Sequence, residues 1–177
     1  GDIYQSATSY LTASPMTTLP PYYSPIGINI NNLTCQSAVT VTSTADSGVG
    51  SVLEAVMKIC SGGTITLNAS PLDLTSGELV INKDMTITTM GGVNQTVQRS
   101  GSPARIFNMA SGTVQLNHVT IANGDGTAML YGGGIYVQLG AILTLNNSIL
   151  SGNTAISGGG IYNNGTLTLT NSTLSGN

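Results

Sequence analysis

The C-terminal part of the chain contains nearly the same sequence twice. Residues 132–153 read GGGIYVQLGAILTLNNSILSGN, and residues 158–177 read GGGIYNNGTLTLTNSTLSGN. The Gly-Gly-Gly-Ile-Tyr blocks begin 26 residues apart, and the Leu-Thr-Leu blocks at Leu143 and Leu167 begin 24 residues apart. Short alternating strings separated by Gly and Asn, at a period in the twenties, are typical of solenoids in which each repeat forms one coil. The repeat therefore predicts a β-solenoid.

The alternating pattern also extends upstream of these two repeats. We expect short strands over 64–67, 78–81, 85–88, 105–107, 113–116, 119–121, 135–137, 143–145, 148–150, 161–162, 167–169 and 172–174. Equivalent positions of successive coils are expected at Met85, Val114, Leu143 and Leu167, and at Val80, Phe107, Tyr136 and Tyr162. About three strands per step predict an all-β, three-sided parallel β-helix of about four to five coils, with leucines inward and threonines outward.

The repeats also predict how the corners between strands are built. Glycine triplets at 132–134 and 158–160 would allow positive φ angles and close approach of neighbouring coils. Asparagines recur at equivalent positions, where stacked amides can form hydrogen bonds along the solenoid axis. The equivalent pairs are Asn147 with Asn171 and Asn153 with Asn177, and the single histidine, His118, takes the place of Asn147 one coil earlier. We therefore interpret His118 as a turn residue rather than as a ligand or base.

The N-terminal third of the chain differs from the repeats. Residues 51–60 read SVLEAVMKIC, in which Ser51 and Glu54 have the spacing of a capping box, and Gly62-Gly63 follows. We expect a helix over about 51–60 that covers the first coil. Residues 1–33 contain four of the six prolines and are expected to form an extended Pro/Ser/Thr/Tyr-rich arm with a short strand around 26–30, which leaves 34–177 as the β-helix domain.

Composition restricts the classes of partner. Only 6% of the residues are charged, far below the roughly 25% of ordinary soluble proteins. Four Lys and Arg against seven Asp and Glu argue against nucleic-acid binding, and no apolar run is long enough to cross a membrane. The sequence shows no secretory signal peptide, and this fits a mature chain from which such a peptide has been removed. Cys35 and Cys60 are expected to form a disulfide in an oxidising, extracellular setting; two buried free thiols are the alternative.

The charged residues do not form the clusters that catalysis needs. Parallel β-helices include pectate lyases and polygalacturonases, whose chemistry requires grouped carboxylates, but no charged residue follows Asp125 here. Lys83 and Asp84 are interpreted as a solvated corner, and Asp125 as a turn residue rather than a calcium ligand. We expect no catalytic, cofactor or metal site.

Two other interpretations of the polar surface are weaker. An ice-binding face would need the same outward residue in every coil, but the columns are interrupted: they read Thr86, Gln115, Thr144, Thr168 and Thr88, Asn117, Asn146, Thr170. Glycosylation sequons occur by chance in a chain rich in Asn, Ser and Thr, and in a secretory pathway some would carry glycan. They lie at Asn32, Asn68, Asn94, Asn146, Asn164 and Asn171.

Two segments carry a resemblance to known proteins. Residues 41–55, VTSTADSGVGSVLEA, are similar to the head Val-Thr-Ser-Thr-Ala-Asp-Ser-Gly-x-Gly-Ser-Leu-Arg-x-Ala of large secreted bacterial proteins, with Leu53 in place of Arg. The GGGIY…LSGN repeats resemble bacterial surface proteins with right-handed parallel β-helix repeats, such as the chlamydial polymorphic outer-membrane adhesins, although Leu150 and Leu174 replace an aromatic residue. Over about 39–177 this resemblance implies a right-handed β-helix and export to the cell surface.

The end of the last repeat leads to the functional hypothesis. The pattern stops at Asn177 without an atypical final coil, so either the chain is a fragment or the open coil is used for stacking. We expect an extracellular structural subunit that forms a filament or surface layer by end-to-end stacking and exchange of the N-terminal arm. The assembly residues would be Ile26, Ile28, Ile30, Leu167, Leu169 and Leu174. The alternative is an adhesin or passenger fragment that meets a host or matrix surface; a polysaccharide-active enzyme and an ice-binding solenoid are more remote.

Overall fold

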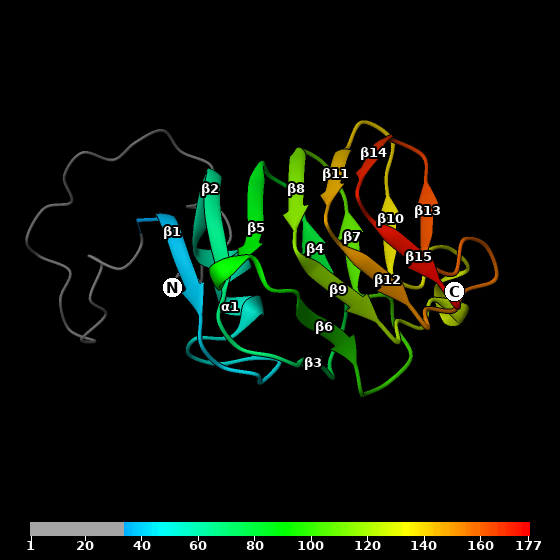
Figure 1. Ribbon diagram of the computed structural model, residues 1–177, viewed down its shortest axis with the longest axis horizontal. Coiled ribbons are helices and arrows are strands. Elements are labelled where there is room, and N and C mark those ends of the chain that lie inside the picture. The colour runs from blue at the N-terminus through cyan, green and yellow to red at the C-terminus, as the bar shows by residue number, and fades with distance from the viewer. Residues whose placement is uncertain (1–33) are drawn as a thin grey trace, which may run out of the picture. The chain divides into compact units, whose positions relative to one another are not determined.

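The chain folds into a β-solenoid whose strands are all parallel. The computed structural model describes residues 34–177 (Figure 1), so the interpretation of 1–33, including Ile26, Ile28, Ile30 and Asn32, lies outside the described residues. Within them, every pairing between strands is parallel. The strands form three sheets, and the backbone passes through each sheet once per coil, which confirms the predicted three-sided solenoid.

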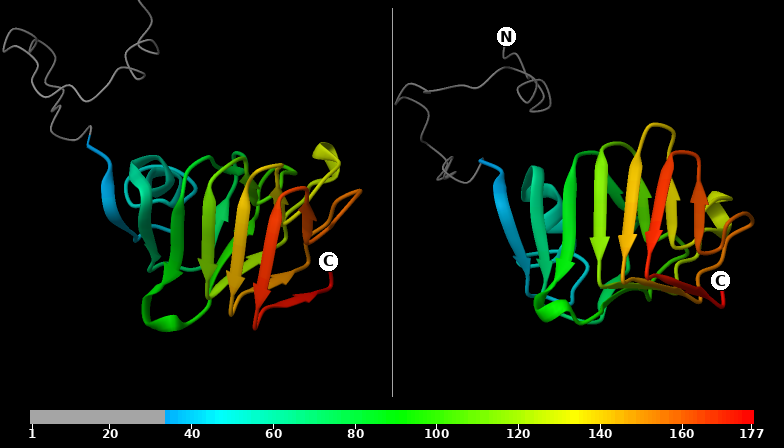
Figure 2. Two further views of the ribbon diagram at one scale, coloured as in Figure 1. Left: turned by 90° about the horizontal axis from the view of Figure 1, so that it is seen from above. Right: turned by 45° about the horizontal axis from the view of Figure 1, so that its top comes forward.

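The three sheets differ in their number of strands. Sheet A contains six: β1 (Gln36–Val41), β2 (Ile59–Leu67), β5 (Met85–Thr89), β8 (Thr113–Asn117), β11 (Ile142–Asn146) and β14 (Thr166–Thr170). Sheet B contains five: β3 (Leu72–Leu74), β6 (Gln95–Arg99), β9 (Val119–Ala122), β12 (Ile149–Ser151) and β15 (Thr173–Ser175). Sheet C contains four: β4 (Leu79–Ile81), β7 (Phe107–Met109), β10 (Ile135–Val137) and β13 (Ile161–Asn163). Two short 3₁₀ turns, η3 (Met90–Gly92) and η4 (Thr127–Met129), interrupt the connections. The strands of sheet A lie side by side in both views of Figure 2.

Stacked aliphatic side chains fill the interior. Leu145 pairs in register with Leu116 on one side and Leu169 on the other, and both Leu116 and Leu145 are fully buried. The predicted column Met85, Val114, Leu143 and Leu167 is in register as expected. Each fully buried aliphatic side chain contributes about 1.5–3 kcal/mol. Regular alternation therefore stabilises the coil without any charged interaction.

The predicted turn position is confirmed in three successive coils. His118, Asn147 and Asn171 follow the strands of sheet A and have φ angles of 58°, 49° and 49°. This left-handed region is unfavourable for most residues and best tolerated by Gly, Asn, Asp and His. The backbone conformation explains why His118 replaces asparagine.

The two glycine triplets lie against each other, as the repeat predicts. The amide of Gly134 donates to Gly159 O at 3.0 Å. A Cβ atom on Gly134 would lie 2.6 Å from Gly160 O, so a side chain at this position would push the neighbouring coils apart. The triplets are needed for close backbone approach between coils.

Two predicted details of the sheets are wrong. Phe107 does not belong to the outward column; it pairs with Leu79 and Ile135 and is fully buried, while Asn108 takes the outward place between Val80 and Tyr136. The strand is therefore displaced toward Met109, because burial of the phenylalanine ring in the core determines the register. Strands β3 and β6 were not predicted, since a three-residue strand and a strand rich in Gln and Arg carry little hydrophobic alternation.

The helix covers the first coil but is shorter than expected. α1 (Val52–Lys58) begins after Ser51, whose Oγ accepts the amide of Glu54 at 3.2 Å. The Glu54 carboxylate accepts the amide of Gly50 at 2.7 Å, one residue before the position of an ideal capping box. Val52, Ala55 and Val56 are buried, and α1 contacts β1, β2 and β4. The helix therefore closes the apolar end of the solenoid.

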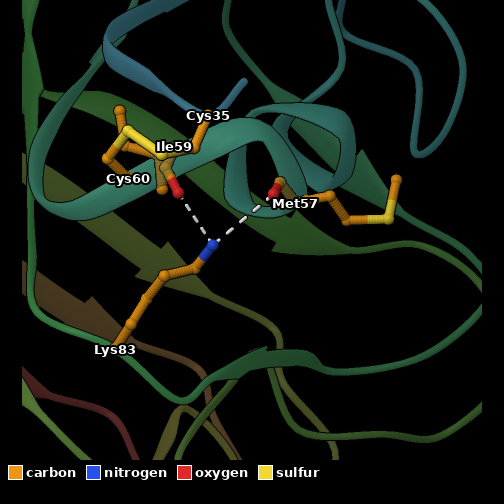
Figure 3. The surroundings of a disulfide bond; sticks show 5 residues. All are labelled: Cys35, Met57, Ile59, Cys60 and Lys83. Carbon is orange, nitrogen blue, oxygen red and sulfur yellow. Dashed lines mark hydrogen bonds between the residues drawn. A yellow bond between two sulfur atoms is a disulfide. The ribbon is translucent and has the colours of Figure 1, made fainter. Parts of the chain in front are cut away.

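The predicted last turn of the helix belongs to β2 instead. Ile59 and Cys60 begin that strand, and Gly62 and Gly63 lie within it rather than ending the helix. Two contacts hold this transition (Figure 3). The Lys83 ammonium donates to Met57 O at 3.4 Å and to Ile59 O at 2.8 Å, and Cys60 is joined to Cys35 by a disulfide, as predicted. The disulfide ties the residue before β1 to the start of β2.

The loop before the helix is attached to the second coil through Asp46. Its Oδ2 accepts the Thr75 hydroxyl at 3.0 Å and the Ser76 amide at 2.7 Å. Partial burial opposes ionisation of Asp46, but the hydrogen bonds from Ser76 and Thr75 outweigh it and lower the pKa of the carboxyl below its usual 3.8.

We expect Asp46→Asn to reduce the sensitivity of the protein to acid. Because the folded pKa is lower than the unfolded one, the carboxylate stabilises the fold above pH 3.8, and this stabilisation is lost as pH falls through the folded pKa. Asn keeps an acceptor oxygen but no titratable proton. Urea unfolding at pH 7 and at about pH 3 should show a smaller loss of stability in the variant, by about 0.5 kcal/mol, because solvent still reaches the partly buried carboxylate. Equal losses would contradict this role.

Candidate functional site

The acidic residues singled out for chemistry serve the backbone, either within a turn or between neighbouring coils. Within residues 34–177, no three side chains of His, Cys, Asp or Glu gather as a metal site would require. Asp84 Oδ1 accepts the amide of Thr113 at 2.7 Å, and Asp125 Oδ1 accepts both the amide and the hydroxyl of Thr127. These hydrogen bonds to Thr127 lower the pKa of Asp125. Among the described helices, none has the length and hydropathy to cross a membrane.

The C-terminal coil, formed by β13, β14 and β15, exposes side chains whose register partners are buried in the coil before it. Leu169 and Leu174 are each 44% exposed, whereas their register partners Leu145 and Leu150 are fully buried. Leu167 is partly buried. Among the described strands, each of these three pairs with a neighbour on one side only. The predicted leucines are therefore brought together on one open apolar end.

Serine and asparagine side chains of one coil accept backbone amides of the preceding coil and so form ladders along the axis. These ladders show what a covering coil would supply. Ser148 Oγ accepts the amide of Val119 at 3.2 Å, and Ser172 Oγ accepts the amide of Ser148 at 3.1 Å. In the same manner, Asn153 Oδ1 accepts the amide of Gly124 at 2.9 Å, and Asn177 Oδ1 accepts the amide of Asn153 at 3.1 Å. In these ladders, each coil thus provides acceptors for backbone amides of the coil before it. This confirms the predicted stacking of Asn153 and Asn177.

A second group of functional interest was not predicted as a site. The described residues contain three tyrosines, and all three meet on the outer side of sheet C. The ring centroids of Tyr131 and Tyr162 are 4.4 Å apart, and those of Tyr136 and Tyr162 are 5.6 Å apart. Tyr136 and Tyr162 are in register on β10 and β13, but Tyr131 comes from the connection 123–134. We call the three rings and the adjacent amides of Asn108, Gln138 and Asn164 the tyrosine face.

The amides of the tyrosine face form a chain along the axis. Gln138 Nε2 donates to Asn108 Oδ1 at 2.7 Å, and Asn108 Nδ2 donates to Glu78 Oε1 at 2.8 Å. Asn164 Nδ2 lies 3.4 Å from the hydroxyl of Tyr136. Planar amides therefore line the sheet beside the rings.

Arg99, Arg105 and Glu78 lie next to one another beside the rings of the tyrosine face, and we call this group the charged corner. It contains Arg99 and Arg105, two of the four Lys and Arg of the chain, which are only 7% and 6% exposed. Arg105 lies 5.0 Å from the ring centroid of Tyr136, and its Nε is 2.5 Å from Glu78 Oε2. That N–H is directed at Met129 Sδ, so the pair with Glu78 is a charge contact rather than a directed hydrogen bond.

Arg99 connects the corner to the neighbouring backbone. Its Nη2 donates to Arg105 O at 3.0 Å and to Gly77 O. Burial lowers the pKa of Arg99, and the charges of Asp46 and Glu78 oppose that effect. Within the described part of the chain, Nε and Nη1 of Arg99 meet no acceptor. The buried guanidinium therefore loses solvation free energy that its hydrogen bonds only partly offset.

The remaining predicted sites are scattered over the surface. The sequon residues Asn68, Asn164 and Asn171 are exposed, whereas Asn94 and Asn146 are partly buried. The outward columns of sheet A are in register as predicted, and β2 adds Thr64 and Thr66 to them. The interruptions at Gln115, Asn117 and Asn146 remain, so the threonine hydroxyls do not form a continuous array.

No protein-family model matches the chain, and no curated protein or solved structure shows significant similarity to it. The resemblance to bacterial surface proteins with β-helix repeats therefore stays a prediction. The open C-terminal coil and the tyrosine face are the two candidate sites that the geometry itself provides.

Proposed function

We propose that this protein is an extracellular structural subunit that assembles by stacking another copy onto its C-terminal coil. The observation that carries the proposal is the exposure of Leu169 and Leu174, whose counterparts in the preceding coil are fully buried. Transfer of these half-exposed leucines out of water would contribute about 25 cal/mol per Å² of apolar area. Unpaired strand edges beside them would gain hydrogen bonds at the same time.

The difference between the two ends supports a head-to-tail contact. Among residues 34–177, α1 covers the core at the N-terminal end and β1 is the edge strand of sheet A. β1 alternates in the same sense as β14, with Val39 and Val41 inward and Thr40 outward, so pairing β14 with β1 of another copy would continue the apolar columns. Unlike surfaces that meet in this way produce filaments unless the rotation closes a ring. The disulfide supports an oxidising compartment such as the extracellular space.

Leu169→Asp and Leu174→Asp are expected to abolish this assembly. A carboxylate on the open coil would be desolvated by any covering strand, whereas the isolated chain keeps it in water. Sedimentation equilibrium and electron microscopy of the purified chain should show concentration-dependent association for the wild type and monomers for the variants. Val93→Asp is the matched control, because Val93 is 65% exposed and lies in the connection between β5 and β6, several coils before the open end. A wild type that stays monomeric at high concentration would refute stacking.

The second candidate is an adhesin or passenger segment of a larger cell-surface protein, in which further coils of the same chain cover the leucines. The Ser148–Ser172 and Asn153–Asn177 ladders favour it, because a following coil of the same repeat type would supply the next serine and asparagine. The intact mass of the native polypeptide distinguishes the two: a chain much longer than 177 residues supports the adhesin and overturns the stacking subunit.

A further inference from the structure

We propose that the tyrosine face binds a neutral polysaccharide. The inference does not depend on assembly, because the rings lie on the outer side of sheet C, whereas stacking would cover the inward leucines and the strand edges of the last coil. It rests on where the aromatic rings gather, on how Tyr131 is held, and on the polar groups and charges beside the rings.

Within residues 34–177, the tyrosine side chains are concentrated in one place. The only phenylalanine of the chain, Phe107, is fully buried in the core, and the chain contains no tryptophan. All three tyrosines of residues 34–177 meet on the tyrosine face, while the other outward positions of the sheets are mainly Thr, Asn and Gln. A local concentration of exposed aromatic and apolar groups on a polar surface indicates an interaction site.

Stacking between coils does not explain Tyr131. Tyr136 and Tyr162 are register partners, so their contact follows from the repeat. Tyr131 instead lies beyond η4, where Leu130 has a φ of 70°, a conformation that is unfavourable for a leucine. Its position is held by a parallel bridge to Ser157, whose amide donates to Leu130 O at 2.9 Å. The loop is therefore shaped to place an additional ring, which is 38% exposed, beside the two on the sheet.

The groups next to the rings match the chemistry of a sugar. The C–H face of a pyranose packs against an aromatic ring, and its hydroxyls need donors and acceptors in the plane of the ring edge. Asn108 and Gln138 provide amides with hydrogen-bonding capacity beyond their contact with each other. Leu130 and Ile156, which are 49% and 68% exposed, extend the apolar area on the neighbouring loops.

The charge of the site favours a neutral polymer over an acidic one. Arg105 is 7% exposed in its side chain and lies against Glu78, which is 19% exposed. The carboxylate is therefore the more accessible of the two charges, and the whole chain carries a net charge of −3. Because Arg99 and Arg105 are buried beneath the rings, a uronate or sulfated polymer would meet no exposed cation of the charged corner, whereas uncharged hydroxyls can bond to the amides.

Affinity electrophoresis of the full chain in gels that contain a β-glucan, a galactomannan or polygalacturonate tests the proposal. We expect at least one neutral polymer to retard the wild type and polygalacturonate to have no effect. Tyr131→Ala should weaken the retarding interaction about tenfold, in keeping with the loss of one stacked ring. Tyr131→Phe, which keeps the ring, should retain most of the affinity, and Val93→Ala, at an exposed residue between β5 and β6, should behave as the wild type. Because the chain has no tryptophan, tyrosine emission provides a second readout of binding.

Three outcomes would overturn the inference: no retardation by either neutral polymer, equal affinity of Tyr131→Ala and the wild type, or retardation by polygalacturonate alone. Circular dichroism of each variant establishes that it is folded. Repeating the measurement with Leu169→Asp separates the two proposals, because that substitution should abolish stacking and leave polysaccharide binding unchanged.

Discussion

Asn153→Ala is expected to lower the free energy of unfolding by on the order of 4 kcal/mol. Asn153 is fully buried, and its amide serves two backbone groups of the preceding coil. Oδ1 accepts the amide of Gly124 at 2.9 Å, and Nδ2 donates to Ile121 O at 3.0 Å. Alanine would leave both groups without a partner in the interior, and each such loss costs about 1–3 kcal/mol. The missing side-chain atoms add a cavity.

Asn177→Ala is the matched control for this position. Asn177 occupies the same place in the next coil and makes the equivalent bond to Leu150 O at 3.0 Å, but it is exposed on the open end. Water can replace the bonds that it makes, so we expect a loss of about 1 kcal/mol. Urea unfolding of both variants, followed by circular dichroism, gives the comparison. Equal losses would show that burial of the amide is not what makes Asn153 important.

Removing the disulfide with Cys35→Ser and Cys60→Ser should cost about 3 kcal/mol. The bond closes a segment with a sequence separation of 25, which includes β1 and α1, and restricts the unfolded chain accordingly. The effect also falls on a critical part of the fold, because α1 and β1 cover the first coil. Loss of the disulfide therefore loosens α1 and β1 over the first coil and also removes the restraint on the unfolded chain.

Thermal unfolding of the double serine variant, with and without a reducing agent, measures this contribution. Reduction should lower the melting temperature of the wild type to that of the variant and leave the variant unchanged. A wild type whose stability does not respond to complete reduction would show that the helix closes the solenoid without help from the disulfide.

Most of the solenoid could be predicted because its stabilising residues recur along the sequence. The alternation around Leu143 and Leu167 specifies strands, inward faces and register together, and Asn147 with Asn171 marks the turns. The strand at Phe107 was misplaced by two residues, because a large ring is drawn into the core irrespective of the local pattern. β3 and β6 were missed for a related reason: their registers are set by neighbouring coils rather than by their own sequence.

The candidate sites differ in how far the sequence could reveal them. The leucines of the last coil were predicted because they belong to the repeat. The tyrosine face could be anticipated only in part: Tyr136 and Tyr162 share a column, but nothing in the sequence around Tyr131 shows that its loop returns to them. The burial of Arg99 and Arg105 in one corner likewise depends on contacts between residues of different sheets. Sites assembled across coils need coordinates to be seen.

The serine and asparagine ladders give the solenoid a polarity. The amides of Ser148 and Asn153 are satisfied by side chains that arrive later in the chain, and the same holds for Val119 and Gly124 one winding earlier. A newly formed layer is therefore left incomplete until its successor closes over it, whereas the helical end is sealed by local contacts and a covalent link. In these last windings each layer completes the one before it, which favours the addition of layers away from the sealed end.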